Sequence, residues 1–208
     1  MPTLTTEELR AVAARLPRVT LAHLPTPLEE APRFSRRLEG PRVLIKRDDC
    51  TGMVMGGNKT RHNEFLLGEA LKQGADVLVW GAGVQSNNCR QTAAACNKLG
   101  LECHLYLTRA THNDDVQGNL LLDHLMGAHV HIVDTPIGPD LDDLLLAKAK
   151  ELREQGRRPA RRSSSALAVI RSSRSGPMGV STMWTCAPIR WSRSRLPWTS
   201  SLWAARLR

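Results

Sequence analysis

Two short segments of the chain combine glycines with side chains that can do chemistry. Residues 55–61 read Met-Gly-Gly-Asn-Lys-Thr-Arg, and residues 81–88 read Gly-Ala-Gly-Val-Gln-Ser-Asn-Asn. Glycines let a ligand approach the backbone closely, and the free N–H groups at the start of a following helix attract anions. We therefore expect both segments to line a ligand site, the first through the amine of Lys59 and the second through Ser86 and Asn87.

Each segment also has a more ordinary interpretation. Lys59 could be a solvated lysine on a helix face, and residues 81–88 could be a capped turn of the kind that any strand–helix unit contains. The second segment does not follow the Gly-x-Gly-x-x-Gly dinucleotide-binding pattern. Neither segment alone decides between a structural and a functional role.

The elements that position these segments follow from the alternation of short apolar runs with longer amphipathic runs. The pattern predicts strands at 42–47, 76–80, 102–107 and 129–133. It predicts helices at 5–16, 58–73, 85–99, 114–126 and 141–155, and a short helix that follows residues 24–28 and ends near residue 38. From residue 40 to residue 155 this alternation predicts an α/β fold: a three-layer open parallel sheet with βαβ units. Ligands bind beyond the carboxyl ends of the strands of such a sheet, where both segments are expected to lie.

Four motifs occur in a characteristic order between residues 20 and 160. They are Pro-Thr-Pro-Leu at 25–28, Ile-Lys-Arg-Asp-Asp at 45–49, Gly-Gly-Asn-Lys-x-Arg at 56–61 and Gln-Ser-Asn at 85–87. In this order and spacing the chain resembles the fold-type II pyridoxal-phosphate enzymes, the group that includes the tryptophan synthase β subunit. Within that group it is similar to the branch that contains D-cysteine desulfhydrase and 1-aminocyclopropane-1-carboxylate deaminase.

The resemblance implies pyridoxal 5'-phosphate as cofactor and a small amino acid as substrate. It implies that Lys59 is catalytic, forms the Schiff base with the cofactor and moves the substrate's α-proton. Asn87 would hydrogen-bond the cofactor's ring oxygen, while Ser86, also expected to be catalytic, would hold the substrate carboxylate together with Asn87. Asn88 is a third expected substrate contact, although it replaces the His or Gln of the family. D-cysteine desulfhydration is the expected reaction, and opening of the aminocyclopropane ring is the alternative.

The composition of the chain changes abruptly near residue 160. Residues 1–160 carry 20 Lys+Arg and 20 Asp+Glu, whereas residues 161–208 carry nine Arg, four of the five Trp and no Lys, Asp or Glu. The formal net charge of +9 therefore belongs to the last 48 residues. We expect two parts: an enzyme-like α/β portion at 1–160 and a basic tail of low order at 161–208.

The tail does not continue the family pattern, which implies a glycine-rich phosphate loop and tyrosines beyond residue 160. The only Tyr of the chain is Tyr106. An Arg-, Ser- and Trp-rich stretch is typical of a GC-rich gene read out of frame, and a frame change near codon 160 is our hypothesis. It predicts weak cofactor retention and little turnover for this chain. Two other classes stay open: a tail that binds single-stranded nucleic acid, and an inactive module that binds a small acid.

The remaining patterns argue against other kinds of site. His129 and His131 alternate along a predicted strand, but no third ligand is near in sequence, so no metal site is expected. Asp48 and Asp49 are expected to be structural. The five Cys form no Cys-x-x-Cys pair, and neither a signal peptide nor an apolar run of membrane-spanning length occurs. We expect a cytoplasmic protein with no membrane partner and, from the resemblance, a homodimer.

Overall fold

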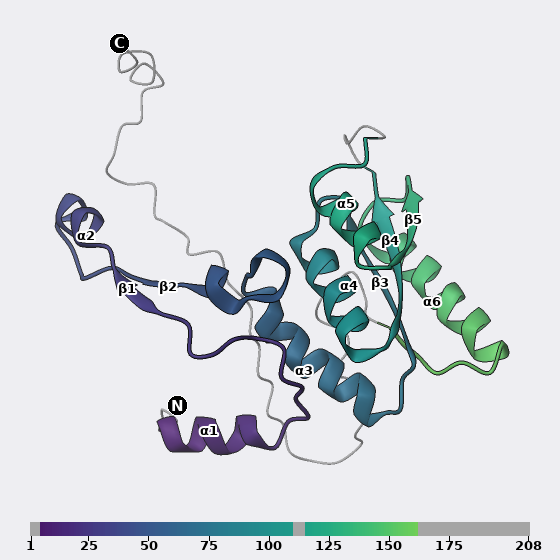
Figure 1. The fold of residues 1–208 in the computed structure, drawn as a ribbon, viewed down its shortest axis with the longest axis horizontal. Helices are drawn as coiled ribbons and strands as arrows, with labels where there is room; N and C mark the ends of the chain where they lie inside the picture. The colour runs from purple at the N-terminus through teal and green to yellow at the C-terminus, as the bar shows by residue number, and fades with distance from the viewer. Residues whose placement is uncertain (1–4, 110–114, 162–208) are drawn as a thin grey trace, which may run out of the picture. The chain divides into compact units, whose positions relative to one another are not determined.

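A parallel four-stranded sheet organises the part of the chain that the computed structural model describes, residues 5–109 and 115–161 (Figure 1). Its strand order is β5-β4-β3-β6, and every neighbouring pair is parallel. The strands are β3 Val77–Gly83, β4 Glu102–Thr108, β5 His129–Val133 and β6 Pro159–Arg161. The predicted α/β fold with a parallel sheet is confirmed.

Helices cover both faces of this sheet, as Figure 1 shows. On one face lies α4 Asn87–Leu99, which packs against β3 and β4 and is flanked by α3 Lys59–Lys72 and α5 Gly118–Leu125. On the other face lies α6 Pro139–Glu154, which packs against β3 and β6. The sheet with its two helical layers therefore has the three-layer arrangement that the alternating pattern predicts.

The side chains of β3 divide between two apolar clusters because successive residues of a strand point to opposite faces. Leu78 and Trp80 belong to the larger cluster, which contains buried side chains of α3, α4, β4 and α5. Val77 and Val79 belong to a smaller cluster with Leu145 and Leu152 of α6. Both faces of β3 are thus buried, as expected for an interior strand of a parallel sheet.

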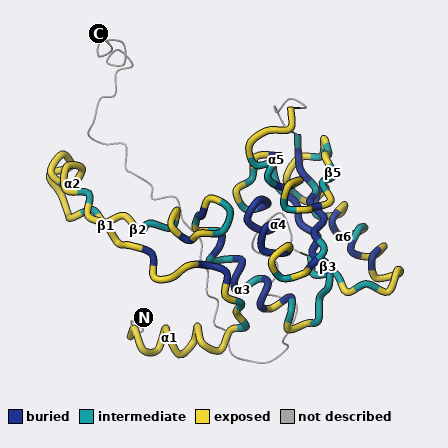
Figure 2. Tube along the Cα trace, viewed as in Figure 1, coloured by how far each residue is buried: buried dark blue, intermediate teal, exposed yellow. Residues whose placement is uncertain are grey.

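The N-terminal part contains helix α1 Thr6–Ala14, the antiparallel pair of β1 Leu28–Glu30 and β2 Leu44–Lys46, and helix α2 Pro32–Leu38. Thr5 caps α1 through a capping box with Glu8, as its sequence predicts. Figure 2 shows these four elements almost entirely exposed, and no residue within them is buried.

Buried Glu64 of α3 holds the segment that follows α1. Its carboxylate accepts hydrogen bonds from the backbone N–H of Leu21 at 3.0 Å and of Ala22 at 2.9 Å. Arg18 donates to the same carboxylate from Nε at 2.8 Å and from Nη2 at 2.5 Å. Four donors therefore satisfy one buried carboxylate, which fixes residues 18–22 against α3.

Several details differ from the expectations. Strand β3 continues through Gly83, although it was expected to end at Trp80, because Gly81–Gly83 pair with β4. Strand β6 begins at Pro159, where the sequence pattern was expected to be lost. The sequence did not predict this strand, because three residues are too few to display a periodicity. Strand β1 was not expected, and it pairs antiparallel with β2. Helix α5 begins at Gly118 and not at residue 114.

Some expectations lie outside the described residues. The tail from residue 162 onward is among them, so its expected low order stays a prediction. Within residues 5–109 and 115–161 no helix has the length and apolar character needed to cross a membrane.

Candidate functional site

The loop before Lys59 has a backbone shape that requires glycine. Two 3-10 turns, Asp48–Thr51 and Met53–Met55, lead to Gly56 with φ +65° and Gly57 with φ +129°. A Cβ atom on Gly56 would lie 1.8 Å from the carbonyl oxygen of Asp49. Only glycine fits there, so the Gly-Gly pair allows the chain to turn sharply into α3 immediately before Lys59.

Asp48 holds this loop in place. Gly57 N–H donates to the Asp48 carbonyl oxygen at 2.8 Å and to Thr51 Oγ1 at 2.9 Å. Arg61 Nε donates to Asp48 Oδ1 at 3.0 Å, and Arg61 Nη2 donates to Thr26 Oγ1 at 2.8 Å. These contacts support the structural interpretation of Asp48, because its side chain is engaged with an arginine that belongs to the Gly-Gly-Asn-Lys-x-Arg motif.

Helix α4 binds the same loop through two side chains near its start. Gln91 Nε2 donates to the carbonyl oxygen of Gly56, and Thr60 Oγ1 donates to Gln91 Oε1 at 3.0 Å. Arg90 Nη2 donates to the same Gly56 carbonyl at 3.2 Å. The glycine loop before Lys59 is therefore joined to α4, the helix that begins at the end of the second glycine-containing segment.

Lys59 is the first residue of α3 and is half-buried. Its amine forms no hydrogen bond or ion pair with any residue in the described ranges. An amine without a protein partner at the start of a helix is available to a ligand. The structure is therefore compatible with the role predicted for Lys59, the formation of a Schiff base with the cofactor.

Ser86 is the N-cap of α4. Its Oγ accepts hydrogen bonds from Asn88 N–H and Cys89 N–H, both at 3.2 Å. Both bonds use oxygen lone pairs, so the hydroxyl hydrogen can donate either to the Cys89 sulfur, with which Ser86 also interacts, or to an anionic group beyond the helix start. Burial raises the pKa of the adjacent Cys89 thiol to about 12, so this thiol is not an anionic nucleophile at neutral pH.

Asn87 has a partner that the sequence did not indicate. Asn119, the second residue of α5, donates from Nδ2 to Asn87 Oδ1 at 2.9 Å and to the backbone oxygen of Gln85 at 2.7 Å. Gln85 Oε1 accepts from Asn119 N–H at 2.9 Å. This network orients the Asn87 amide so that its Nδ2 points away from Asn119 and can donate to a ligand.

Sequence reasoning missed Asn119 because 32 residues separate it from Asn87 and it follows a loop with no strong pattern. A Gly-Asn pair before a helix is a common turn signal, and nothing local marks it as part of the site.

Behind these residues lie buried polar atoms that have no hydrogen-bond partner within the described residues. They are Asn88 Oδ1, Arg90 Nε and both carboxylate oxygens of Asp123. Burial raises the pKa of Asp123 to about 7, and the nearby Arg90 guanidinium lowers it only in part. Asn88 therefore offers an acceptor next to Ser86, beside the start of α4.

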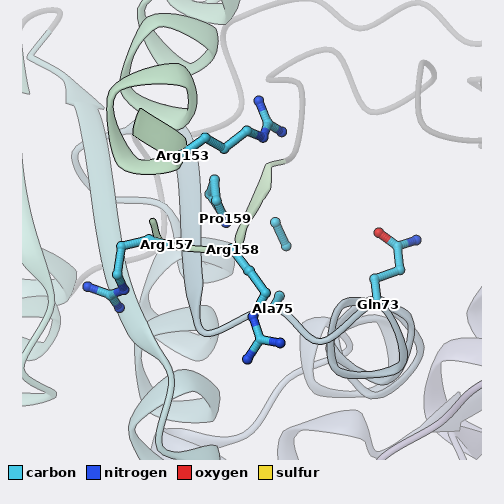
Figure 3. Close-up of a pocket in the computed structure, with 7 residues that line it drawn as sticks. Gln73, Ala75, Arg153, Arg157, Arg158 and Pro159 are labelled. Atoms are coloured by element: carbon cyan, nitrogen blue, oxygen red, sulfur yellow. The ribbon is translucent and has the colours of Figure 1, made fainter. Parts of the chain in front are cut away.

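A pocket of about 250 Å³ lies away from these residues, where β3 and β6 begin. Figure 3 shows its lining by Arg153, Arg157 and Arg158 together with Gln73 and Pro159. These are the amino ends of the strands, whereas Ser86 follows the carboxyl end of β3. The pocket is thus separate from the predicted site.

The sequence profile of the pyridoxal-phosphate dependent enzyme family matches residues 19–186. The chain therefore belongs to the family of pyridoxal-phosphate dependent enzymes, with the fold-type II architecture that its motifs suggested. The match continues past residue 160, where the composition changes.

Individual relatives are similar over the same region. The chain is 45% identical over 152 residues to a D-cysteine desulfhydrase of Klebsiella pneumoniae, covering 70% of this chain and 44% of the relative. It is 41% identical over 149 residues to a Pyrococcus horikoshii protein provisionally named 1-aminocyclopropane-1-carboxylate deaminase, covering 72% and 45%. A crystal structure of an ACC deaminase homologue superposes with a TM-score of 0.71 at 37% identity, covering 78% and 49%. The chain thus spans less than half the length of these curated relatives.

Proposed function

We propose that this chain carries the lysine-bearing and carboxylate-binding part of a pyridoxal-phosphate-dependent lyase that acts on a small amino acid. One observation carries the proposal. The carbonyl oxygen of Gly56, three residues before Lys59, accepts hydrogen bonds from Gln91 and Arg90. Both donors belong to α4, the helix that Ser86 caps. A free amine and an anion-binding helix start therefore belong to one site. In a member of this family, that is the pairing needed to hold both a cofactor and an amino acid.

The donor set of the site fits pyridoxal 5'-phosphate and its substrate. Bound pyridoxal phosphate supplies an electron sink for the substrate's α-carbon. Lys59 Nζ is the attachment point and, when released, the base that holds or returns the α-proton. Asn87 Nδ2, oriented by Asn119, is a donor for the cofactor's ring oxygen.

Ser86 binds the substrate carboxylate in this proposal. Its hydroxyl donates to one carboxylate oxygen, while the uncapped N–H groups and positive dipole of α4 favour the negative charge. Asn88 contributes less, since its buried Oδ1 is an acceptor and would repel a carboxylate. This oxygen suits an N–H or O–H donor, such as the substrate's ammonium group or an ordered water.

D-cysteine is the proposed substrate, converted with water to pyruvate, ammonia and hydrogen sulfide. The second candidate is 1-aminocyclopropane-1-carboxylate, converted with water to 2-oxobutyrate and ammonia. The similarity to proteins with both names supports each candidate. Product analysis separates them, because only the first reaction releases sulfide.

The test of cofactor attachment does not depend on turnover. The purified chain is incubated with pyridoxal phosphate, reduced with borohydride and digested, and the modified peptide is identified by mass spectrometry. We expect the label on Lys59, its loss in Lys59→Ala and its retention in Lys98→Ala, which removes an exposed lysine of α4. Labelling spread evenly over surface lysines would refute the assignment of Lys59.

A further inference from the structure

A second group of chemically active side chains lies on the opposite face of the sheet from α4, where β4 pairs with β5. Glu102 and His104 are two residues apart on β4 and therefore point to the same face. His129 of β5 is the register partner of His104, so it stands beside it on that face. Parallel pairing thus brings a carboxylate and two imidazoles together from segments that are 25 residues apart.

The potential ligand atoms of these three residues converge. His104 Nε2 lies 2.8 Å and His129 Nε2 lies 3.6 Å from the same oxygen, Glu102 Oε1. All three atoms lie within 4.8 Å of one another. A tetrahedral zinc ion with bonds of about 2.0 to 2.1 Å needs its ligand atoms roughly 3.4 Å apart. The group therefore already has nearly the spacing of a zinc-ligand triangle.

We propose that Glu102, His104 and His129 bind a divalent transition-metal ion of the zinc type, with water completing the coordination. Two neutral imidazoles and one carboxylate form a ligand set that zinc accepts readily, and softer or harder ions are less well matched. The site is independent of Lys59 and Ser86, and it stands or falls without the proposed enzymatic function.

Residues next to the three proposed ligands contact them and fix their orientation, as is usual for metal sites. In the structure His104 Nε2–H donates to Glu102 Oε1 at 2.8 Å, and a bound ion would take the place of this proton. His131 Nε2 lies 3.2 Å from His104 Nδ1, so it can accept the ring proton that His104 then carries on Nδ1. Arg157 Nη1 binds the other carboxylate oxygen, Glu102 Oε2, at 2.5 Å and leaves Oε1 facing the imidazoles.

The exposure of the ligands suits a metal that enters from solvent. The His104 side chain is 8% exposed and Glu102 is 29% exposed, so both are held by their surroundings. His129 is 58% exposed and can turn its ring toward an arriving ion. A bound ion would join β4 to β5, one of the two edge strands of the described sheet, and would stabilise that edge.

The sequence did not indicate this site, because His129 and His131 were the residues that looked like a ligand pair. In the structure His131 Nε2 lies within hydrogen-bond distance of His104 Nδ1, and the residues that join His129 in the ligand group are Glu102 and His104 of β4. Only the parallel register between the strands reveals the missing ligands.

The experiment titrates the untagged, metal-free full-length chain with Co²⁺ and follows its visible spectrum. We expect one ion per chain, with the intense bands of low-coordinate Co²⁺ and no sulfur-to-cobalt charge-transfer band. His129→Ala, which removes an exposed ligand, should abolish the spectrum, and His124→Ala, which removes an exposed histidine of α5, should leave it unchanged. His131→Ala should weaken binding about tenfold.

Thermal melting with Zn²⁺ gives an independent reading. Zinc should raise the melting temperature of the wild-type chain and of His124→Ala, and should not raise that of His129→Ala. The proposal is overturned if the spectrum shows thiolate ligation, if it shows only weak octahedral bands, or if His129→Ala binds cobalt as tightly as the wild-type chain does.

Discussion

Asn119 Nδ2 donates a hydrogen bond of 2.9 Å to Asn87 Oδ1, and this contact fixes which end of the Asn87 amide faces the candidate cofactor site. Asn119 itself does not belong to the glycine-containing segments. It is therefore a positioning residue, and it acts on the proposed ligand only through Asn87.

We predict that Asn119→Asp weakens pyridoxal phosphate binding about fivefold, equivalent to the ~1 kcal/mol of one net hydrogen bond. Aspartate is of similar size but cannot donate to Asn87 Oδ1, so the Asn87 amide loses its fixed orientation. The measurement is the fraction of chain trapped by borohydride as the cofactor concentration rises. Asn97→Asp, an exposed asparagine near the end of α4, is the matched control. Equal trapping by Asn119→Asp and the control would contradict the positioning role.

Ser86 has two separable roles, and two substitutions distinguish them. Ser86→Ala removes the N-cap of α4 and should lower the free energy of unfolding by about 1 kcal/mol in urea denaturation. Ser86→Asp keeps a capping acceptor and should retain stability, but its negative charge should abolish binding of the substrate carboxylate. If Ser86→Asp binds a carboxylate ligand as well as the wild-type chain does, Ser86 is only a cap.

Glu64 should make the fold sensitive to acid. Burial by itself would raise the pKa of Glu64, but hydrogen bonds from Ala22 and Leu21 and the charge of Arg18 outweigh it, so the pKa is lowered from 4.5. A lowered carboxyl pKa contributes stability that is fully present above about pH 4.5 and is lost as the pH falls through the folded-state pKa.

We therefore predict that the urea midpoint of the wild-type chain falls as the pH drops below about 4.5. Glu64→Gln should be less stable at pH 7, because it loses the charged partner of Arg18, and should lose part of that acid sensitivity. Glu69→Gln, an exposed residue on the same helix, should follow the wild-type profile. Parallel pH profiles for wild type and Glu64→Gln would show that Glu64 is not the responsible group.

Asp123 should have the opposite effect on stability. Burial raises its pKa from 3.8 to about 7, with partial compensation by Arg90, so its contribution to stability is present below about pH 4 and is lost as the pH rises through about 7. Asp123→Asn removes the buried charge and should stabilise the fold at pH 8, by at most roughly 4 kcal/mol.

The pH profile of Asp123→Asn should accordingly be flatter between about pH 4 and 7 than that of wild type. Asp143→Asn, on the exposed side of α6, is the control and should leave the profile unchanged. A less stable Asp123→Asn protein at pH 8 would mean that a bound cation or water satisfies the carboxylate in solution.

The composition break near residue 160 gives a prediction about the gene. If a frame change produced the Arg-rich tail, one of the alternative frames beyond codon 160 should encode a glycine-rich phosphate loop. Sequencing the DNA tests this directly. The hypothesis fails if neither frame encodes such a loop.

Much of the fold was readable from local patterns. The apolar run at residues 129–133 is β5 without any change of bounds, and the helix expected at 58–73 is α3. Helix α3 carries a helical repeat whose buried side chains lie on one face, and three of the five residues of β5 are β-branched, which favours a strand. Strand β6 carries no such pattern, because its three residues are a strand only through pairing with β3.

The sequence by itself determined the residue types of the candidate site: the glycines that permit the sharp turn before Lys59, and the serine and asparagines that begin α4. These depend on local backbone geometry, which neighbouring residues set. Only the tertiary structure decided which distant side chains act on them. Gln91 on Gly56, Asn119 on Asn87, and Glu102 and His104 beside His129 all arise from packing and strand register, which depend on the whole sheet and not on any short stretch of sequence.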